Sequence, residues 1–152
     1  MLSEIDEKRL IPSHNVKVRC HPGATIIDDM FDHLKPYLKK EPDQIILHVS
    51  TNDASSKKTS DTIFRNLLDL KAFIKTKAPK TNVTFSCPIV RHDNGLANLK
   101  IIHLRNKLKT SNENVILNEN IDYNSLGRKG LHMTPRGDTR LAMNFINFLK
   151  RL

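Results

Sequence analysis

The sequence predicts an α/β domain with three layers, in which helices cover both faces of a parallel sheet. Short apolar runs alternate with amphipathic helical patterns, in the order strand, helix, strand, helix, strand, helix, strand, helix. This alternation is typical of parallel strands joined by crossover helices. The length of 152 residues and a hydrophobic fraction of 38% suit one ordinary core. We therefore expect a single domain over residues 1–152.

Four segments are predicted to be strands. Residues 15–20 alternate apolar and polar side chains, as in a strand with one buried face. The other three segments are short continuous apolar runs, which suit strands buried on both faces; they are residues 44–49, 82–89 and 115–117. In α/β folds, ligand groups gather at the carboxyl ends of such strands.

Four amphipathic helices are predicted between and after these strands. Thr25 is expected to open the first, Ser60 the second, and Thr134 followed by Pro135 the last. Each helix has apolar residues at helical spacing, which should face the sheet. These stripes are Ile27-Met30-Leu34-Leu38, Ile63-Leu67-Leu70-Ile74, Leu96-Leu99-Ile102 and Leu141-Phe145-Phe148-Leu152.

The charge balance is basic, with 25 Lys and Arg against 16 Asp and Glu and a net charge of +9. A basic excess favours polyanion partners such as nucleic acid or an acidic membrane surface. The cationic residues are scattered rather than clustered, so we favour a solvated basic surface.

The cysteine and apolar patterns bear on cofactors and location. Cys20 and Cys87 end apolar runs and are expected to be buried, and no Cys-x-x-Cys spacing suggests a metal or redox site. Residues 1–10 are rich in charge and do not form a signal peptide. No apolar run approaches the roughly 20 residues that span a bilayer. We expect an intracellular, cytoplasmic protein without a membrane partner.

Three local features point to chemistry. Asn52 and Asp53 follow a buried run, where an Asn amide could stabilise an oxyanion or simply cap a turn. Gly23 follows a predicted strand, where its backbone N–H could approach a substrate or merely form a turn. His132 precedes the last helix and could act as a general base or lie unused on the surface.

Together these features resemble the SGNH (GDSL-type) hydrolases. Gly23, the Asn52-Asp53 pair and His132 match the second, third and fifth blocks of that family in order and approximate spacing. The segments 18–53, 91–95 and 130–148 look like a variant common in animal genomes, some of it found in LINE-type retrotransposon proteins.

The resemblance implies a flavodoxin-like sheet and a serine ester hydrolase. The family's nucleophilic Ser lies in a Gly-Asp-Ser motif after the first, central strand. By this resemblance Gly23 and Asn52 would form the oxyanion hole, Asp53 would support it, and His132 would be the catalytic base. The substrates would be small acyl esters such as acetyl esters. This chemistry needs no metal or organic cofactor.

The sequence departs from the family pattern at its start. No Gly-Asp-Ser occurs, and residues 1–5 look like those that follow this motif. The central strand and the nucleophile would then precede Met1. Ser3 is the nearest hydroxyl, but it would lie within a helix rather than on the strand-to-helix turn. Either the reading frame begins at an internal Met of a decayed copy, or a short protein has lost catalysis.

Two further departures fall inside the expected site. Lys129 stands where the family usually has the Asp that orients the His, and a Lys cannot take that role. Asp122, Asp138 or a backbone carbonyl could serve instead. Ser50 stands where the family usually has Gly.

These departures predict little or no esterase activity for the 152-residue chain. A non-catalytic binding module is the second hypothesis, with the pocket kept for ligand or protein contacts or the basic surface binding nucleic acid. A degenerate remnant is the third. The sequence does not predict the oligomeric state.

Overall fold

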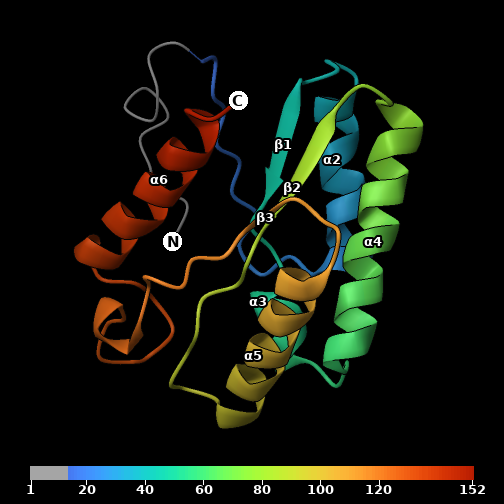
Figure 1. Ribbon diagram of the computed structural model, residues 1–152. Helices are drawn as coiled ribbons and strands as arrows, with labels where there is room; N and C mark the ends of the chain where they lie inside the picture. The colour runs from blue at the N-terminus through green and yellow to red at the C-terminus, as the bar shows by residue number, and fades with distance from the viewer. Residues whose placement is uncertain (1–13) are drawn as a thin grey trace.

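The sheet has three parallel strands in the order β1-β2-β3 (Figure 1). We describe residues 14–152 of a computed structural model. The strands are β1 (Gln44–Leu47), β2 (Asn82–Ser86) and β3 (Val115–Ile116), and Leu47 pairs with Phe85, which in turn pairs with Val115. Three of the four predicted strands are thus confirmed. The interpretation of residues 1–5 and Ser3 lies outside the described residues.

The prediction of a strand over residues 15–20 is wrong. The segment is extended but joins no ladder among the described residues. Val16 and Val18 pack against the core while Lys17 and Arg19 are exposed, so the alternation reports real burial. A β-strand also needs a neighbouring strand that pairs with its backbone N–H and C=O groups, and the residues of one segment do not determine whether such a neighbour is present. Cys20 is exposed, contrary to expectation, whereas Cys87 is buried as expected.

Helices cover both faces of the sheet, which confirms the three-layer α/β/α fold class. Three long helices lie on one face and α6 on the other (Figure 1). The helical elements in chain order are the π-helix η2 (Ile26–Met30), α2 (Phe31–Leu38), α3 (Thr51–Ser55), α4 (Ser60–Lys77), α5 (Gly95–Thr110), the 3-10 helix η3 (Tyr123–Ser125) and α6 (Pro135–Leu149). None of these helices has both the length and the hydropathy that crossing a bilayer requires.

Two apolar clusters form the core, one on each face of the sheet. Leu47 and Phe85 belong to the larger cluster beneath α2, α4 and α5, whereas Ile46 and Ile116 contact the smaller one beneath α6. Adjacent strand residues point to opposite faces, which places Ile46 and Leu47 in different clusters.

Side-chain caps fix where three helices begin. Thr59 accepts a hydrogen bond from the Thr62 N–H (3.2 Å), so the cap of α4 lies one residue before the expected Ser60. Asn94 caps α5 by accepting from the Ala97 N–H (2.9 Å). Thr134 caps α6 with Pro135 as its first residue, as predicted.

The first predicted stripe is confirmed at Met30, Leu34 and Leu38 but not at Ile27, and the stripe predicted for α5 is wrong. Ile26 is buried and Ile27 is 43% exposed, because the turn at 26–30 is a π-helix with a wider spacing between stacked residues. Leu96 and Leu99 of α5 are 75% and 54% exposed. The buried stripe of α5 is instead Ala97, Ile101, Leu104 and Leu108. Both α5 stripes have helical spacing, so spacing alone does not choose between them.

The last predicted stripe is confirmed except at its end, since Phe148 is partly buried against the smaller cluster. Leu141 and Phe145 are buried, and Leu149 completes the buried face of α6. Leu152 lies beyond the end of α6 and is 66% exposed.

Candidate active site

The Gly23 loop joins the extended segment 15–20 to η2. Gly23 has a φ of +79°, a left-handed conformation that favours glycine. No atom lies within 4 Å of the position that a Cβ on Gly23 would take. Gly23 is exposed at the surface of the protein.

A left-handed residue turns the chain from β1 into the short helix that bears Asn52. Ser50 has a φ of +85° and is buried, and α3 begins at the next residue. This conformation is strained for a residue with a Cβ, which explains physically why glycine suits the position. Residues 51–55 therefore form a helical turn that fixes the direction of Asn52.

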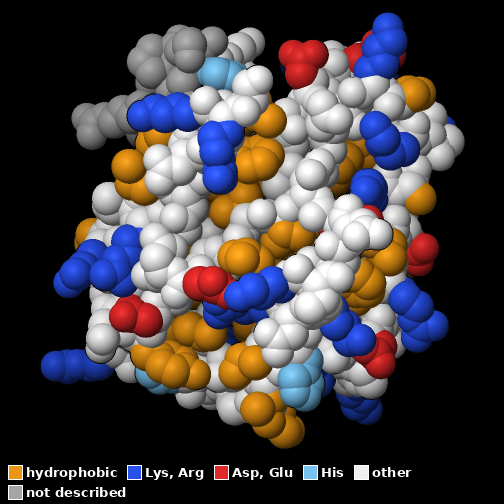
Figure 2. All heavy atoms as spheres, viewed as in Figure 1, with side chains coloured by type: hydrophobic (Ala, Val, Ile, Leu, Met, Phe, Trp, Pro, Cys, Tyr) orange, Lys and Arg blue, Asp and Glu red, His pale blue; other side chains and the backbone are white. Residues whose placement is uncertain are grey.

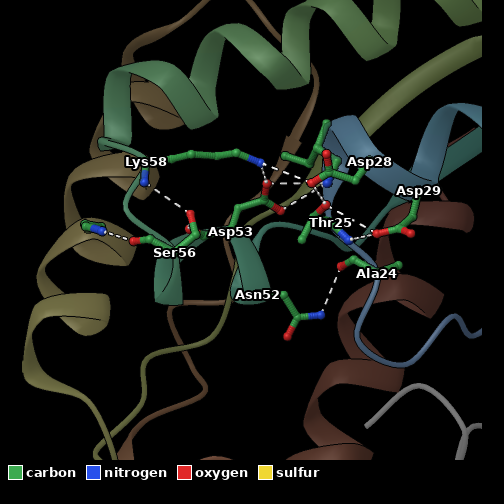
Figure 3. A network of polar contacts seen from close by, with 10 residues as sticks. Ala24, Thr25, Asp28, Asp29, Asn52, Asp53, Ser56 and Lys58 are labelled. Atoms are coloured by element: carbon green, nitrogen blue, oxygen red, sulfur yellow. Dashed lines mark hydrogen bonds and ion pairs between the residues drawn. The ribbon is translucent and has the colours of Figure 1, made fainter.

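Asn52 and the Gly23 loop are brought together. The Asn52 side-chain Nδ2 donates to the carbonyl oxygen of Ala24, the residue after Gly23, at 2.9 Å (Figure 3). Asn52 itself is exposed. A primary amide has two N–H groups, so this contact leaves Asn52 a second donor.

Asp53, the residue after Asn52, is fully buried and connects α3 to η2. Its carboxylate accepts hydrogen bonds from the Ile26 N–H, at 3.2 and 3.4 Å to the two oxygens, and from Lys58 Nζ at 3.1 Å (Figure 3). Lys58 also lies 3.9 Å from Asp28 Oδ2. Asp53 thus ties α3 to the start of η2, and sequence reasoning missed its partner Lys58.

Thr25 holds the other side of the Gly23 loop. Its backbone N–H donates to Asp29 Oδ2 at 2.8 Å, and its hydroxyl donates to Asp28 Oδ2 at 2.7 Å. Asp29 and Asp53 thus give acceptors to backbone N–H groups at the start of η2, which have no partner within the helix.

His132 lies on the loop before α6, with an exposed side chain. The loop is held by its backbone: the Gly127 N–H donates to the His132 carbonyl oxygen at 2.8 Å, and Leu126 and Met133 form an isolated bridge. Among residues 14–152, no hydrogen bond joins His132 to Gly23, Asn52 or a hydroxyl group. The structure thus assembles Gly23, Asn52 and Asp53 directly but not His132.

Asp122, one of the suggested substitutes for the orienting carboxylate, is engaged elsewhere. It accepts from Ser125 Oγ at 3.0 Å and lies 3.3 Å from Arg140 Nη1. The Ser125 hydrogen bond, aided by Arg140, holds the pKa of Asp122 below its ordinary value. Lys129, at the position of the missing Asp, is exposed.

Arg91 links α3 to the loop that contacts the His132 segment. It is buried, and its Nε and Nη2 donate to the two Asp93 oxygens at 2.7 and 2.5 Å. Its Nη1 donates to Ser55 Oγ at 2.5 Å and lies 3.4 Å from the Thr51 carbonyl oxygen. Sequence reasoning noted residues 91–95 but gave Arg91 no role, although an arginine just after a buried strand could have signalled one.

Metal ligands do not cluster in the described part of the chain. No group of three or more His, Cys, Asp or Glu side chains there has a geometry that could hold a metal ion. The groups that the structure brings together are the Asn52 side-chain amide, which is a hydrogen-bond donor, and the backbone of the Gly23 loop. Such donors can stabilise negative charge that develops on a carbonyl oxygen.

The fold is similar to that of several solved esterases and lipases. An acetyl esterase mutant solved with an acetate ion aligns with a TM-score of 0.72 at 16% identity, over 86% of this chain and 69% of its own. A carbohydrate esterase family 3 protein from Talaromyces cellulolyticus aligns with a TM-score of 0.73 at 16% identity, over 86% of this chain and 69% of its own. A lipase/acylhydrolase from Enterococcus faecalis aligns with a TM-score of 0.68 at 20% identity, over 85% of this chain and 72% of its own. No protein-family model and no curated protein matches the chain.

Proposed function

We propose that Gly23, Asn52 and His132 are the oxyanion and base groups of an SGNH-type ester hydrolase. The complete form would hydrolyse small acyl esters such as acetyl esters. The observation that carries this proposal is the hydrogen bond from Asn52 Nδ2 to the Ala24 carbonyl oxygen, which sets the Asn52 amide beside the Gly23 backbone. Solved esterases with the same fold support the substrate class.

The proposed reaction is acyl transfer through a serine. The serine hydroxyl attacks the ester carbonyl and passes its proton to His132. The Gly23 backbone N–H and the second N–H of Asn52 donate to the oxyanion that forms. His132 then protonates the leaving alcohol, and water attacks the acyl-enzyme by the same route in reverse. Asp53 has no contact with substrate in this scheme and keeps the two oxyanion donors together.

The nucleophile of this scheme would belong to a Gly-Asp-Ser strand preceding Met1. The position of β1 at the edge of the sheet formed within residues 14–152 is compatible with such a neighbour. On this proposal the 152-residue chain alone turns over esters feebly or not at all, because acyl transfer needs the serine.

The test compares two lengths of the protein with p-nitrophenyl acetate as substrate. The longer form includes whatever coding sequence precedes Met1 in the transcript and should contain Gly-Asp-Ser. In that form, Asn52→Ala should lower kcat by roughly 10²–10³-fold, the loss typical of one oxyanion donor. His132→Ala should lower it further. Turnover by the 152-residue chain that disappears in His132→Ala, or a longer form indifferent to both changes, would refute the proposal.

The nucleic-acid-binding alternative depends on the net charge of +9. Figure 2 shows Lys and Arg side chains distributed over the face in view rather than gathered in one patch. Several cationic groups are also paired, including Lys107 with Asp61 (2.6 Å) and Lys109 with Glu119 (2.8 Å). We therefore favour the hydrolase over a binding module.

A further inference from the structure

We propose that Asp93, clamped by Arg91, is the carboxylate that faces His132 and replaces the one lost at Lys129. This inference rests on the proposed function, because it gives His132 the partner that a histidine base needs. A carboxylate beside such a histidine fixes its tautomer and stabilises its protonated form. Asp93 lies on the β2–α5 loop, 39 positions from His132 in the sequence, so the pairing depends on how two loops meet.

The two loops are in direct contact. The His92 N–H donates to the Gly130 carbonyl oxygen at 2.8 Å. Gly130 has a φ of +68°, and a Cβ on it would meet the His92 Cβ at 2.5 Å and the Asp93 backbone nitrogen at 3.1 Å. Only a glycine allows this approach. The backbone of Asp93 thus touches the residue two positions before His132.

Arg91 fixes the orientation of the Asp93 carboxylate. The ion pair is bidentate, which sets the plane of the carboxylate as well as its position. The arginine is only 7% exposed and is held in turn by Ser55 and Thr51 of α3. A carboxylate has about four lone-pair sites, so two hydrogen bonds from Arg91 leave capacity for a donor from His132. The same arginine therefore connects the helix that bears Asn52 to the carboxylate beside His132.

The electrostatics agree with this placement. The hydrogen bond from Arg91 holds the pKa of Asp93 below its ordinary value, and the positive charge of His132 acts in the same direction. The other charged or titratable groups on the contacting segments are His92 beside Asp93, Arg128 and Lys129 before His132, and Arg136 and Asp138 in the first turn of α6.

In this arrangement Asp93 is a positioning residue. It touches neither the ester nor the oxyanion and acts by holding the His132 ring. The charge of His132 should act on the Asp93 carboxylate directly. A residue that only packs between the two loops would not show this coupling of charges.

The test follows the Asp93 carboxyl carbon by NMR as pH changes. The protein is the 152-residue chain labelled with ¹³C at aspartate carboxyl groups. The spectra cover about pH 5 to 8, where histidines titrate and aspartates stay ionised. The variants are His132→Gln and His92→Gln, both at exposed positions in the two touching loops. Asp61 serves as an internal control, because its pKa responds to His103 rather than to His132.

The expected result is an inflection in the Asp93 signal of the unaltered chain that vanishes in His132→Gln and persists in His92→Gln. The Asp61 signal should be the same in all three proteins, which also shows that they are equally folded. An Asp93 signal without an inflection, or one whose inflection survives in His132→Gln, would overturn the inference. Because the readout needs no turnover, its failure is distinguishable from a failure of ester hydrolysis in the longer form.

Discussion

The Asn52 amide donates a hydrogen bond to the carbonyl oxygen of Ala24 at 2.9 Å, although the two residues stand 28 positions apart. This contact joins α3, which follows β1, to the loop that contains Gly23. The neighbouring Asp53 carboxylate accepts a hydrogen bond from the Ile26 N–H and so also connects α3 to the segment after Gly23. The left-handed turn at Ser50 sets the direction from which Asn52 approaches. The predictions below test these supports separately.

Replacing Asp53 by Asn should destabilise the domain. The change removes a buried charge that accepts from Lys58 and from the Ile26 backbone. Losing charge-assisted hydrogen bonds in a buried position costs about 2 kcal/mol in the free energy of unfolding. Urea denaturation would measure it. Asp61→Asn is the matched control, since the Asp61–Lys107 pair is exposed and should leave the midpoint unchanged. Equal effects of the two changes would contradict the supporting role of Asp53.

Ser50→Gly and Ser50→Ala should differ in stability although both remove the hydroxyl. A Cβ at a φ of +85° is strained, and glycine relieves that strain while alanine keeps it. The glycine variant should be more stable than the alanine variant by about 1 kcal/mol. Thermal or urea unfolding of the pair decides the point. An alanine variant at least as stable as the glycine variant would show that the turn is not left-handed.

Gly130→Ala should do more harm than Gly23→Ala. Both glycines have positive φ, so alanine is strained at each. At Gly23 the added Cβ meets open space, whereas at Gly130 it would collide with His92. We expect a cost of about 1 kcal/mol at Gly23 from backbone strain alone and a clearly larger one at Gly130. Comparable urea midpoints for the two variants would mean that the 92–93 and 130–132 loops are not in contact.

His48 should make the domain less stable in mild acid. Its Nδ1 lies 2.9 Å from Ser86 Oγ, and burial lowers its pKa to about 4. In the unfolded chain the pKa of His48 is about 6.5, so the unfolded state binds a proton at higher pH than the folded state does. As pH falls, this protonation stabilises the unfolded state relative to the folded state. The contribution of His48 should be complete above about pH 6.5, decline by up to about 1.4 kcal/mol per unit toward pH 4, and then level off.

Denaturation of the unaltered chain and of His48→Gln at several pH values tests this directly. The stability difference between the two should shrink from pH 7 to pH 4. His92→Gln, at an exposed position, is the control and should follow the unaltered chain. A constant difference over this range would show that His48 titrates alike in the folded and unfolded states.

The layers of the fold could be predicted from sequence because they depend on local pattern. The runs at 44–49 and 82–89 are apolar enough to be buried in any arrangement, and the cap at Thr134-Pro135 starts a helix without tertiary help. The segment 15–20 shows the limit. Its alternation predicts one buried face correctly, but strand pairing depends on a neighbour that the segment itself does not encode.

The site was predictable in its parts but not in its connections. Gly23, Asn52 and Asp53 could be chosen because their order and spacing resemble those of a known family, whereas each position alone also fits a simple turn. The roles of Lys58, Arg91 and Asp93 depend on contacts between loops far apart in the sequence, which local spacing does not record. The stripe Leu96-Leu99-Ile102 failed for the same reason, since α5 has two apolar faces and tertiary packing selects the other.

The central claim is that Gly23 and Asn52 face one ligand, with His132 beside it. The most direct measurement titrates the ¹⁵N-labelled chain with acetate, the product of acetyl-ester hydrolysis, and uses chloride at equal ionic strength as the control. We predict that the Gly23 backbone amide and the Asn52 side-chain amide shift with one common Kd, that the His132 signals follow, and that Asn52→Leu abolishes the response. If acetate moves these signals no more than chloride does, the residues do not form an oxyanion site and the account is wrong.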